Sequence, residues 1–363
     1  MKNTSIEAYF DITQYSLSKN LKELYLIEFL NRLHKHHCNN SFEYKRIVEK
    51  LFNSNNEISS IEEMPFIPIS MFKEYALKSI ADDKVYKVIS SSGTSSSMPS
   101  RIFLDVEMAQ IQTKALSKII GHILGNERLP MLIVDSKAVF KDRLSFSARG
   151  AGILGLSVFG KKHHYILDDN FEIDLESFKK FIEENNGKKM LIFGFTFMVW
   201  LYLFMPEFDF KIDLSNAILI HSGGWKKMQE LAVDNKVFKS MLNEKFGIKE
   251  IFNFYGMAEQ VGSVFLENSE GYLHCPNYSD IIIRNPIDFS VQDNGKEGLI
   301  QVISILPKSY PGHSILTEDI GICMGEDNCS NGWKGKYFKI LGRAKKAEIR
   351  GCSDTFGALK NNS

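Results

Sequence analysis

The spacing of hydrophobic residues changes near residue 86. Before it, Ile27 and Leu30 recur at helical spacing among charged residues, and basic residues close the segment 21–37, as a helix C-terminus prefers. After it, short β-rich runs alternate with amphipathic stretches, a pattern typical of an α/β fold with a largely parallel sheet. From about residue 270 no long helix separates the runs, which predicts a smaller, more antiparallel section. The predicted strands are residues 131–135, 154–160, 189–195, 216–222, 250–256, 280–284, 298–306 and 337–343.

The most hydrophobic stretch of the chain is Met190–Met205. It is shorter than the roughly 20 apolar residues that a membrane-spanning helix needs, and it contains Gly194 and Thr196. We therefore expect no membrane span. The stretch is interpreted as a buried strand that enters a buried helix, and some of its side chains are candidates for lining a pocket for an apolar substrate.

Charge and composition restrict the class of protein. The 363 residues include 44 Lys plus Arg and 44 Asp plus Glu, so the formal net charge is zero. A dedicated nucleic-acid binder needs a basic excess to displace counterions from phosphates, so no nucleic-acid partner is expected. The length predicts two domains, or one large α/β unit with an addition. Five scattered cysteines and the lack of an apolar signal segment in residues 1–11 favour a cytoplasmic protein with reduced thiols.

Three histidines stand close together at the end of the first predicted long helix. Apart from Cys38, no carboxylate or cysteine has a spacing that would complete a metal site with His34, His36 and His37. They are therefore interpreted as a solvated helix end.

A serine-rich segment follows the strand-like run 85–89. Hydroxyl and backbone N–H groups in a tight loop suit phosphate oxygens, although the Gly-Lys-Ser/Thr ending of a Walker loop is missing. The other interpretation is a flexible surface linker. The candidate phosphate-binding residues are Ser91, Ser92, Gly93, Thr94 and Ser95.

A second candidate motif lies at the end of the predicted strand 216–222. In open α/β sheets, ligands bind at the carboxyl ends of strands. Gly223 and Gly224 permit close approach of the backbone to a ligand, and Trp225 offers a surface for stacking. An ordinary β-to-α turn explains the same residues equally well.

Two further motifs combine an aromatic ring with carboxylates. Tyr255 and Gly256 end another predicted strand, and Glu259 follows them; this order suits a nucleotide base with Mg²⁺ held near phosphates. A core tyrosine beside a solvated glutamate is the alternative. Further along, Asp319 is suited to both ribose hydroxyls, and Arg343 to the same ribose or to a phosphate.

In this order, the four motifs resemble the signatures of the adenylate-forming (acyl-activating) superfamily. The segment 342–354, together with HSGGWK at 221–226 and FYGMAEQVGS at 254–263, looks like the acyl-protein synthetase (LuxE) family, the fatty-acid-activating component of bacterial fatty acid reductase. The similarity runs from about residue 65 to the end of the chain.

This resemblance implies a fold and a division of the chain. The expected fold is α/β: an adenylate-forming core with mostly parallel sheets and a smaller β-rich section, without the usual C-terminal domain. The core is expected at 81–343, with a helical region at 1–80 packed on it and a short arm at 344–363 that carries Cys352.

The resemblance also implies a reaction. A fatty acid carboxylate attacks the α-phosphate of ATP, with Mg²⁺ on or near Glu259, and the thiol of Cys352 then takes the acyl group for delivery to an acyl reductase partner. Lys345, Lys346 and Arg350 lie close to Cys352 in sequence and would favour its thiolate. The acyl chain length, the pathway and the oligomeric state stay open.

Two other functions are left open by departures from the family pattern. The adenylation lysine of the superfamily has no counterpart, and Lys226, Lys227, Lys345 and Arg101 are the possible substitutes. The alternatives are an acyl-CoA ligase, in which coenzyme A takes the acyl group, and a catalytically weak acyl-carrying or scaffold subunit.

Two more patterns are weaker. Gly150–Gly155 matches the dinucleotide fingerprint GxGxxG, but no convincing strand precedes it, so it is interpreted as a glycine-rich turn near the acyl pocket. Related phenylacetate-type ligases have a Cys/His metal site, for which His274, Cys275, Cys323 and Cys329 are the candidates. Asn268 replaces one expected cysteine, so whether a zinc site persists at His274 and Cys329 stays open.

Overall fold

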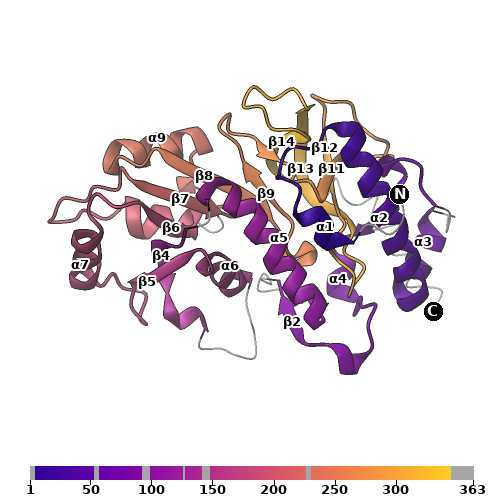
Figure 1. Cartoon of the computed structure of the whole chain (residues 1–363), viewed down its shortest axis with the longest axis horizontal. Coiled ribbons are helices and arrows are strands. Elements are labelled where there is room, and N and C mark those ends of the chain that lie inside the picture. The colour runs from indigo at the N-terminus through magenta and orange to yellow at the C-terminus, as the bar shows by residue number, and fades with distance from the viewer. Residues whose placement is uncertain are drawn as a thin grey trace.

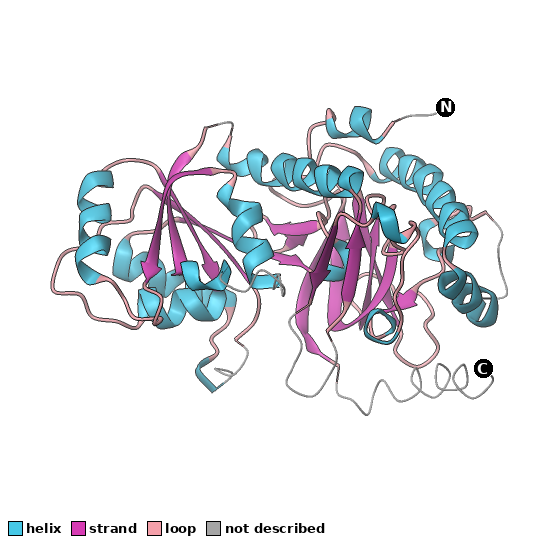
Figure 2. Cartoon of the chain, turned by 90° about the horizontal axis from the view of Figure 1, so that it is seen from below, coloured by secondary structure: helices cyan, strands magenta, loops and turns pink. Residues whose placement is uncertain are grey.

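The computed structural model describes residues 5–52, 57–91, 99–125, 127–140, 148–225 and 230–344. Figure 2 shows two groups of strands side by side, one enclosed by helices on the left and one backed by the N-terminal helices on the right. Hydrogen bonds join the two groups into one continuous mixed sheet.

Parallel strands form the first part of this sheet, labelled in Figure 1. The chain runs from the strand β4 outward to an edge strand, β5, and then returns to β6 on the other side of β4, so the direction of strand addition reverses between β4 and β6. Ligands of open α/β sheets bind beyond the carboxyl ends of strands near such a reversal. In sheet order, these strands are β5 (Gly160–Leu167), β4 (Leu129–Ser136), β6 (Met190–Phe195), β7 (Ala217–Ser222) and β8 (Glu250–Gly256).

Antiparallel strands extend the sheet beyond β8. The pairing continues through β9, β10, β14, β13, β12 and β11, and a short strand, β1, pairs parallel with β13. The predicted antiparallel section after residue 270 is therefore confirmed. The strands are β9 (Val264–Glu267), β10 (Leu273–His274), β11 (Ser279–Arg284), β12 (Glu297–Ser304), β13 (Ser314–Glu326), β14 (Lys336–Arg343) and β1 (Ile67–Pro68).

Helices cover the sheet and connect its parallel strands. The start of helix α5 is determined by the local sequence. Asp105 is the N-cap of this helix, and the Asp105 carboxylate accepts a hydrogen bond from the backbone N–H of Met108 at 2.7 Å. A separate hairpin of β2 (Lys87–Ser90) and β3 (Arg101–Leu104) forms the stem of the serine-rich segment. The helices are α1 (Ile6–Phe10), α2 (Lys19–Asn40), α3 (Phe42–Phe52), α4 (Met71–Glu74), α5 (Val106–Leu124), α6 (Ala148–Ser157), α7 (Leu175–Asn185), α8 (Thr196–Val199) and α9 (Asn235–Phe246), with 3-10 turns η1 (Ile61–Glu63), η2 (Asp82–Lys84), η3 (Lys137–Phe140) and η6 (Ala258–Gln260).

The hydrophobic stretch 190–205 is a buried strand that enters helical turns, as predicted. β6 leads directly into α8, and α8 into a π-helical turn, η4 (Trp200–Phe204). Where the structure describes the chain, each helix is too short or too polar to cross a bilayer.

The predicted strand at 154–160 is wrong, because residues up to Ser157 belong to helix α6 and strand β5 begins only at Gly160. A short apolar run does not distinguish a buried strand from a buried helix. The GxGxxG match therefore lies in a helix rather than in a turn. Its glycines serve close packing: a Cβ on Gly155 would lie 2.9 Å from Leu116, and one on Gly152 would lie 3.3 Å from the ring of Phe195.

The interpretation of the histidines as a solvated helix end is also wrong for two of the three. His34 and His37 are buried, 4% and 0% exposed, because the end of α2 packs against the β-rich part of the fold. Burial lowers the pKa of both imidazoles, that of His37 to about 3, so both are neutral at physiological pH.

Candidate nucleotide site at the strand ends

The third and fourth motifs meet through a direct hydrogen bond. The hydroxyl of Tyr255, at the end of β8, donates to Oδ2 of Asp319 on β13 at 2.7 Å. Burial, together with the negative charge of Asp319, raises the pKa of Tyr255 well above its ordinary value of 10. The phenol therefore remains a donor throughout the physiological range, and it fixes one oxygen of the carboxylate.

Arg343 faces the same carboxylate. It pairs with Asp319 across the β13–β14 ladder, and its Nε lies 3.5 Å from Oδ1 of Asp319. The guanidinium side chain is 72% exposed and the Asp319 side chain 19% exposed. An ion pair this exposed adds little to folding stability, so both groups are free to serve a ligand.

The two glycines of the second motif lie beside Tyr255. Ser222 pairs with Phe254 in the parallel ladder of β7 and β8, and its hydroxyl donates to the Phe254 carbonyl at 2.8 Å. The turn at Gly223–Gly224 therefore begins level with the residue before Tyr255. Gly223 has a φ of +80°, and a Cβ there would lie 3.2 Å from the ring of Phe195. Both facts favour glycine at this position.

Glu259 lies three residues beyond Gly256, on η6. Its side chain is buried, and within the described ranges no group donates a hydrogen bond to its carboxylate. After burial itself, the charge of Glu259 contributes to the raised pKa of Tyr310, which places the two side chains near each other. Carboxylate oxygens are the ligands that Mg²⁺ prefers, so Glu259 is a candidate for holding this cation.

The serine-rich segment is held by a described stem. Ser91 and Ser100 exchange hydrogen bonds at its base: the Ser91 N–H donates to the Ser100 carbonyl at 3.1 Å, and the Ser100 N–H donates to Oγ of Ser91 at 3.0 Å. β3 of this stem contacts η6, the turn that carries Glu259. Ser92, Gly93, Thr94, Ser95, Lys226, Lys227, Lys345 and Cys352 lie outside the described residues.

Trp225 has a different environment from the one predicted for a stacking residue. Its ring packs edge-on against Trp200 at 5.2 Å and Phe238 at 6.2 Å, in the hydrophobic core beneath α9. This packing explains why a tryptophan occurs at the position and favours a structural role. Stacking on a nucleotide base stays a prediction.

An apolar groove of about 660 Å³ lies next to this cluster. Trp200, Phe204 and Met205 contribute to it from the hydrophobic stretch 190–205, and Leu231 and Met241 line it from the region of α9. The charged residues Glu207, Glu244 and Lys245 complete the lining. Members of the stretch thus line an apolar hollow. Its use by a substrate stays a prediction.

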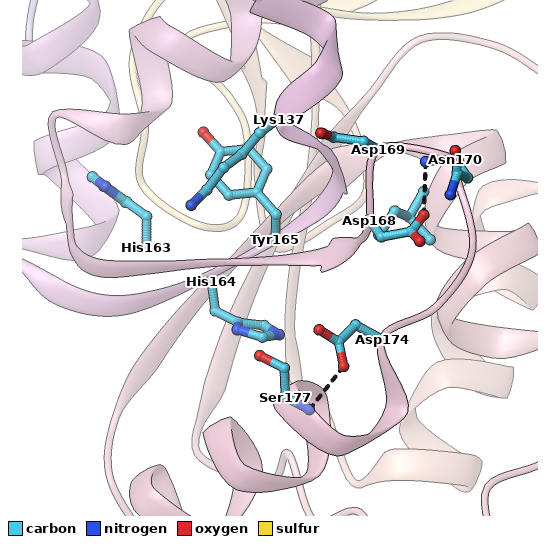
Figure 3. A pocket seen from close by; sticks show the side chains of 10 residues that line it. Lys137, His163, His164, Tyr165, Asp168, Asp169, Asn170, Asp174 and Ser177 are labelled. Atoms are coloured by element: carbon cyan, nitrogen blue, oxygen red, sulfur yellow. Dashed lines mark hydrogen bonds between the residues drawn. The ribbon is translucent and has the colours of Figure 1, made fainter.

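A second, polar cavity of about 440 Å³ opens at the edge strand β5. Figure 3 shows Lys137 and Tyr165 on one side of the strand and His164, Asp174 and Ser177 on the other. The described residues that line it include none of the predicted site residues. The cavity is therefore distinct from the meeting point of the motifs.

The amide side chain of Asn268 contacts two of the candidate zinc ligands, His274 and Cys329. The Asn268 side-chain nitrogen lies 3.2 Å from Sγ of Cys329 and 3.3 Å from Nδ1 of His274, and Nε2 of His274 donates to the Lys334 carbonyl at 3.0 Å. Among the described residues, no group of three or more His, Cys, Asp or Glu is arranged to hold a metal ion.

Several residues around the site belong to none of the sequence motifs. Thr196 follows β6, and its hydroxyl lies 2.9 Å from Nδ1 of the buried His221 and 3.2 Å from the Ser222 carbonyl, which ties the ends of β6 and β7 together. Tyr310 and Gly312 pack against the Glu259 segment from a loop 50 residues later. The sequence signal for Thr196 is its position as a polar residue at the end of a predicted strand. The sequence contains no comparable signal for Tyr310 and Gly312.

The chain is similar to known proteins in sequence and in structure. The sequence model of the family described as "Acyl-protein synthetase, LuxE" matches residues 4–359. A "Long-chain-fatty-acid--luciferin-component ligase" of Vibrio harveyi is 25% identical over 334 residues, covering 88% of this chain and 84% of the relative. A protein of the same name from Aliivibrio fischeri is 23% identical over 325 residues, covering 87% and 84%.

A solved structure shares the fold. It is a 2-hydroxyisobutyryl-CoA ligase in the postadenylation state in complex with 2-HIB-AMP. The TM-score is 0.67 at 13% sequence identity, and the match covers 90% of this chain and 69% of that one. The predicted adenylate-forming α/β fold is thereby confirmed.

Proposed function

Because the chain belongs to the acyl-protein synthetase family LuxE, we propose that it activates a fatty acid with ATP and then takes up the acyl group on its own Cys352. The fatty acid is the substrate class in the names of the two bacterial relatives. The observation that carries the nucleotide part is the hydrogen bond from Tyr255 to Asp319, because it joins two motifs that are far apart in sequence.

In the first step, a carboxylate oxygen of the fatty acid attacks the α-phosphorus of ATP. A new P–O bond forms, the bond to the β-phosphate oxygen breaks, and pyrophosphate leaves with that electron pair. Asp319 and Arg343 hold the ribose in this proposal, since the carboxylate oxygen not bonded to Tyr255 faces the exposed Arg343 guanidinium at 3.5 Å, a contact weak enough for a ribose hydroxyl to join or replace. The backbone at Gly223–Gly224 lies along the base, and residues 91–95 bind the phosphates.

Glu259 fits a magnesium ion, because its carboxylate has no protein partner in the described parts of the chain and oxygen is the ligand that Mg²⁺ prefers. Bound there, Mg²⁺ would offset phosphate charge during the attack. Since the stem strand β3 contacts η6, Glu259 and the serine-rich segment would act on the same end of the nucleotide.

In the second step, the Cys352 thiolate attacks the acyl carbon of the adenylate. A C–S bond forms, the acyl C–O bond breaks, and AMP leaves with the electron pair. The product is a thioester on the enzyme, which we propose is delivered to an acyl reductase in the cytoplasm. The apolar groove at Trp200 and Phe204 supports an aliphatic chain as the acyl group.

The test is ATP–pyrophosphate exchange with and without a panel of fatty acids, in the parent protein and in Cys352→Ser. The proposal predicts exchange that depends on fatty acid in both, and covalent labelling by radioactive acyl groups in the parent alone. Cys38→Ser, a change at a half-buried cysteine, is the matched control and should label normally.

Each other outcome contradicts a part of the proposal. Acyl-CoA formation without protein labelling would indicate an acyl-CoA ligase. The absence of exchange with every acid would indicate a carrier or scaffold subunit, and labelling of Cys352→Ser would exclude that cysteine as the acceptor.

A further inference from the structure

The segment Pro307–His313, which we call the hub, connects three parts of the fold that the sequence treats as separate. It touches the N-terminal helix α2, the stem strand β3 and the Glu259 turn η6. Each connection is made by groups of low exposure, so the hub is part of the core rather than a surface loop.

On the side of α2, two buried imidazoles hold the hub. Nε2 of His37 lies 3.1 Å from the Pro307 carbonyl, which only accepts, so this nitrogen carries the proton. Nδ1 then accepts from the Ser79 hydroxyl at 2.7 Å. The ring of His37 stacks on His313 at 4.8 Å, and Nε2 of His313 lies 3.2 Å from the hydroxyl of Tyr44 on α3.

On the opposite side, the hub fixes the turn that carries Glu259. The Val261 N–H donates to the hydroxyl of Tyr310 at 3.1 Å, and the Gln260 side chain donates to the Gly312 carbonyl at 3.0 Å. A Cβ on Gly312 would lie 2.7 Å from the Glu259 carbonyl oxygen, so the two backbones are in close contact. Glu259 and the two residues that follow it are thus attached to the hub.

The hub also holds the stem of the serine-rich segment. The Ser309 hydroxyl donates to the Phe103 carbonyl on β3 at 2.8 Å, and the Ser309 carbonyl accepts from the Ser79 N–H at 2.8 Å. Ser79 therefore bonds to the hub and to His37 at once. The stem strand β3 and the Glu259 turn are therefore held by the same short piece of chain.

We propose that His37 and His313 are positioning residues that fix Glu259 and the serine-rich stem relative to each other through the hub. The inference rests on the proposed function for its catalytic meaning, although the physical coupling exists independently of it. The N-terminal helices α2 and α3 thereby act, through the hub, on the position of the Glu259 turn.

The first test measures this coupling without any activity. Amide hydrogen exchange of the peptide covering 257–263 is compared in the parent, His37→Ala and His274→Ala. His274 is the matched control, because it is also a buried neutral imidazole whose Nε2 bonds to a carbonyl, but it does not touch the hub. We expect exchange of this peptide to rise about tenfold in His37→Ala and to stay within about twofold of the parent in His274→Ala.

The second test separates positioning from stability. The Mg²⁺ concentration for half-maximal ATP–pyrophosphate exchange should rise about fivefold in His37→Ala, with the KM for fatty acid unchanged. Tyr310→Phe removes only the hydroxyl that accepts from Val261, so it tests the link between the hub and the Glu259 turn by itself. If His37→Ala does not fold, His37→Gln tests the histidine's own part. His37→Gln should restore part of the effect, since its amide donates to Pro307.

Unchanged amide exchange and unchanged Mg²⁺ dependence in folded His37→Ala or Tyr310→Phe would overturn the inference. A parent protein without exchange activity on any acid would instead contradict the proposed function, and the amide-exchange comparison would still decide the coupling.

Discussion

The hydroxyl of Tyr255 donates a hydrogen bond to Oδ2 of Asp319, 64 positions later in the chain, at 2.7 Å. The pair brings the end of the parallel strand β8 to the antiparallel strand β13. Both halves of the sheet therefore contribute to one candidate nucleotide site.

Tyr255→Phe should raise the KM for ATP about tenfold, because Asp319 loses the donor that orients it and a hydrogen bond to a charged group is worth about 1.5 kcal/mol or more. Exchange kinetics at varied ATP concentration measure this. Tyr272→Phe is the control. Its ring packs on Tyr337 near the start of β14, whereas Arg343 is at the end of that strand. Equal KM values in the two variants would contradict the role of Tyr255.

Arg343→Ala should leave the free energy of unfolding within about 0.5 kcal/mol of the parent, since its ion pair with Asp319 is exposed. The KM for ATP should nevertheless rise roughly tenfold if the guanidinium contacts the nucleotide. Urea unfolding and exchange kinetics on the same variant separate the two effects. A loss of stability without a change in KM would give Arg343 a purely structural role.

Gly262→Ala should destabilise the fold by about 2–3 kcal/mol, because two costs add. Gly262 has a φ of +87°, and a Cβ there would lie 2.8 Å from Cα of Gln112. Gly271→Ala is the matched control, with a φ of +81° and a nearest neighbour at 3.5 Å. Urea unfolding should show a clearly smaller loss in this control; equal losses would mean that α5 does not brace the Glu259 turn.

Stability should fall as the pH is lowered from about 6.5 toward 4. Burial lowers the pKa of His37 and His221 to about 3 and that of His274 to about 4, from an ordinary value of 6.5. In this window the unfolded chain binds protons that the folded chain does not, so each histidine costs up to about 1.4 kcal/mol per pH unit. The free energy of unfolding at pH 7.5, 6 and 5 measures the slope.

His37→Gln should lower the slope of the unfolding free energy against pH by the contribution of one proton, up to about 1.4 kcal/mol per pH unit, because glutamine does not titrate. A free energy of unfolding that is constant between pH 7.5 and 5 would show that these imidazoles are not buried neutral in solution.

The fold class could be predicted from the sequence because parallel strands inside a sheet are buried on both faces and are therefore continuously apolar. The apolar runs at 131–135, 189–195 and 216–222 are such strands. The sequence did not predict β13, whose centre carries Thr317, Glu318 and Asp319. A strand whose middle carries polar and charged residues lacks the apolar pattern by which strands are recognised.

The same limit applies to the site. The order of Gly223–Gly224, Tyr255 and Asp319 indicated one nucleotide site, and the structure brings these three together. The histidine network and the hub were missed, since a polar helix end becomes buried only through its partner Pro307, 270 residues later. Local sequence contains no information about such a contact.

The account depends most on acyl transfer from an adenylate formed in this chain to Cys352. The direct measurement is the intact mass of the protein after incubation with ATP, Mg²⁺ and a long-chain fatty acid. We predict a mass increase equal to the acid minus one water, which requires ATP and is absent in Cys352→Ser. An unchanged mass in the parent, or the same increase in Cys352→Ser, would contradict the account.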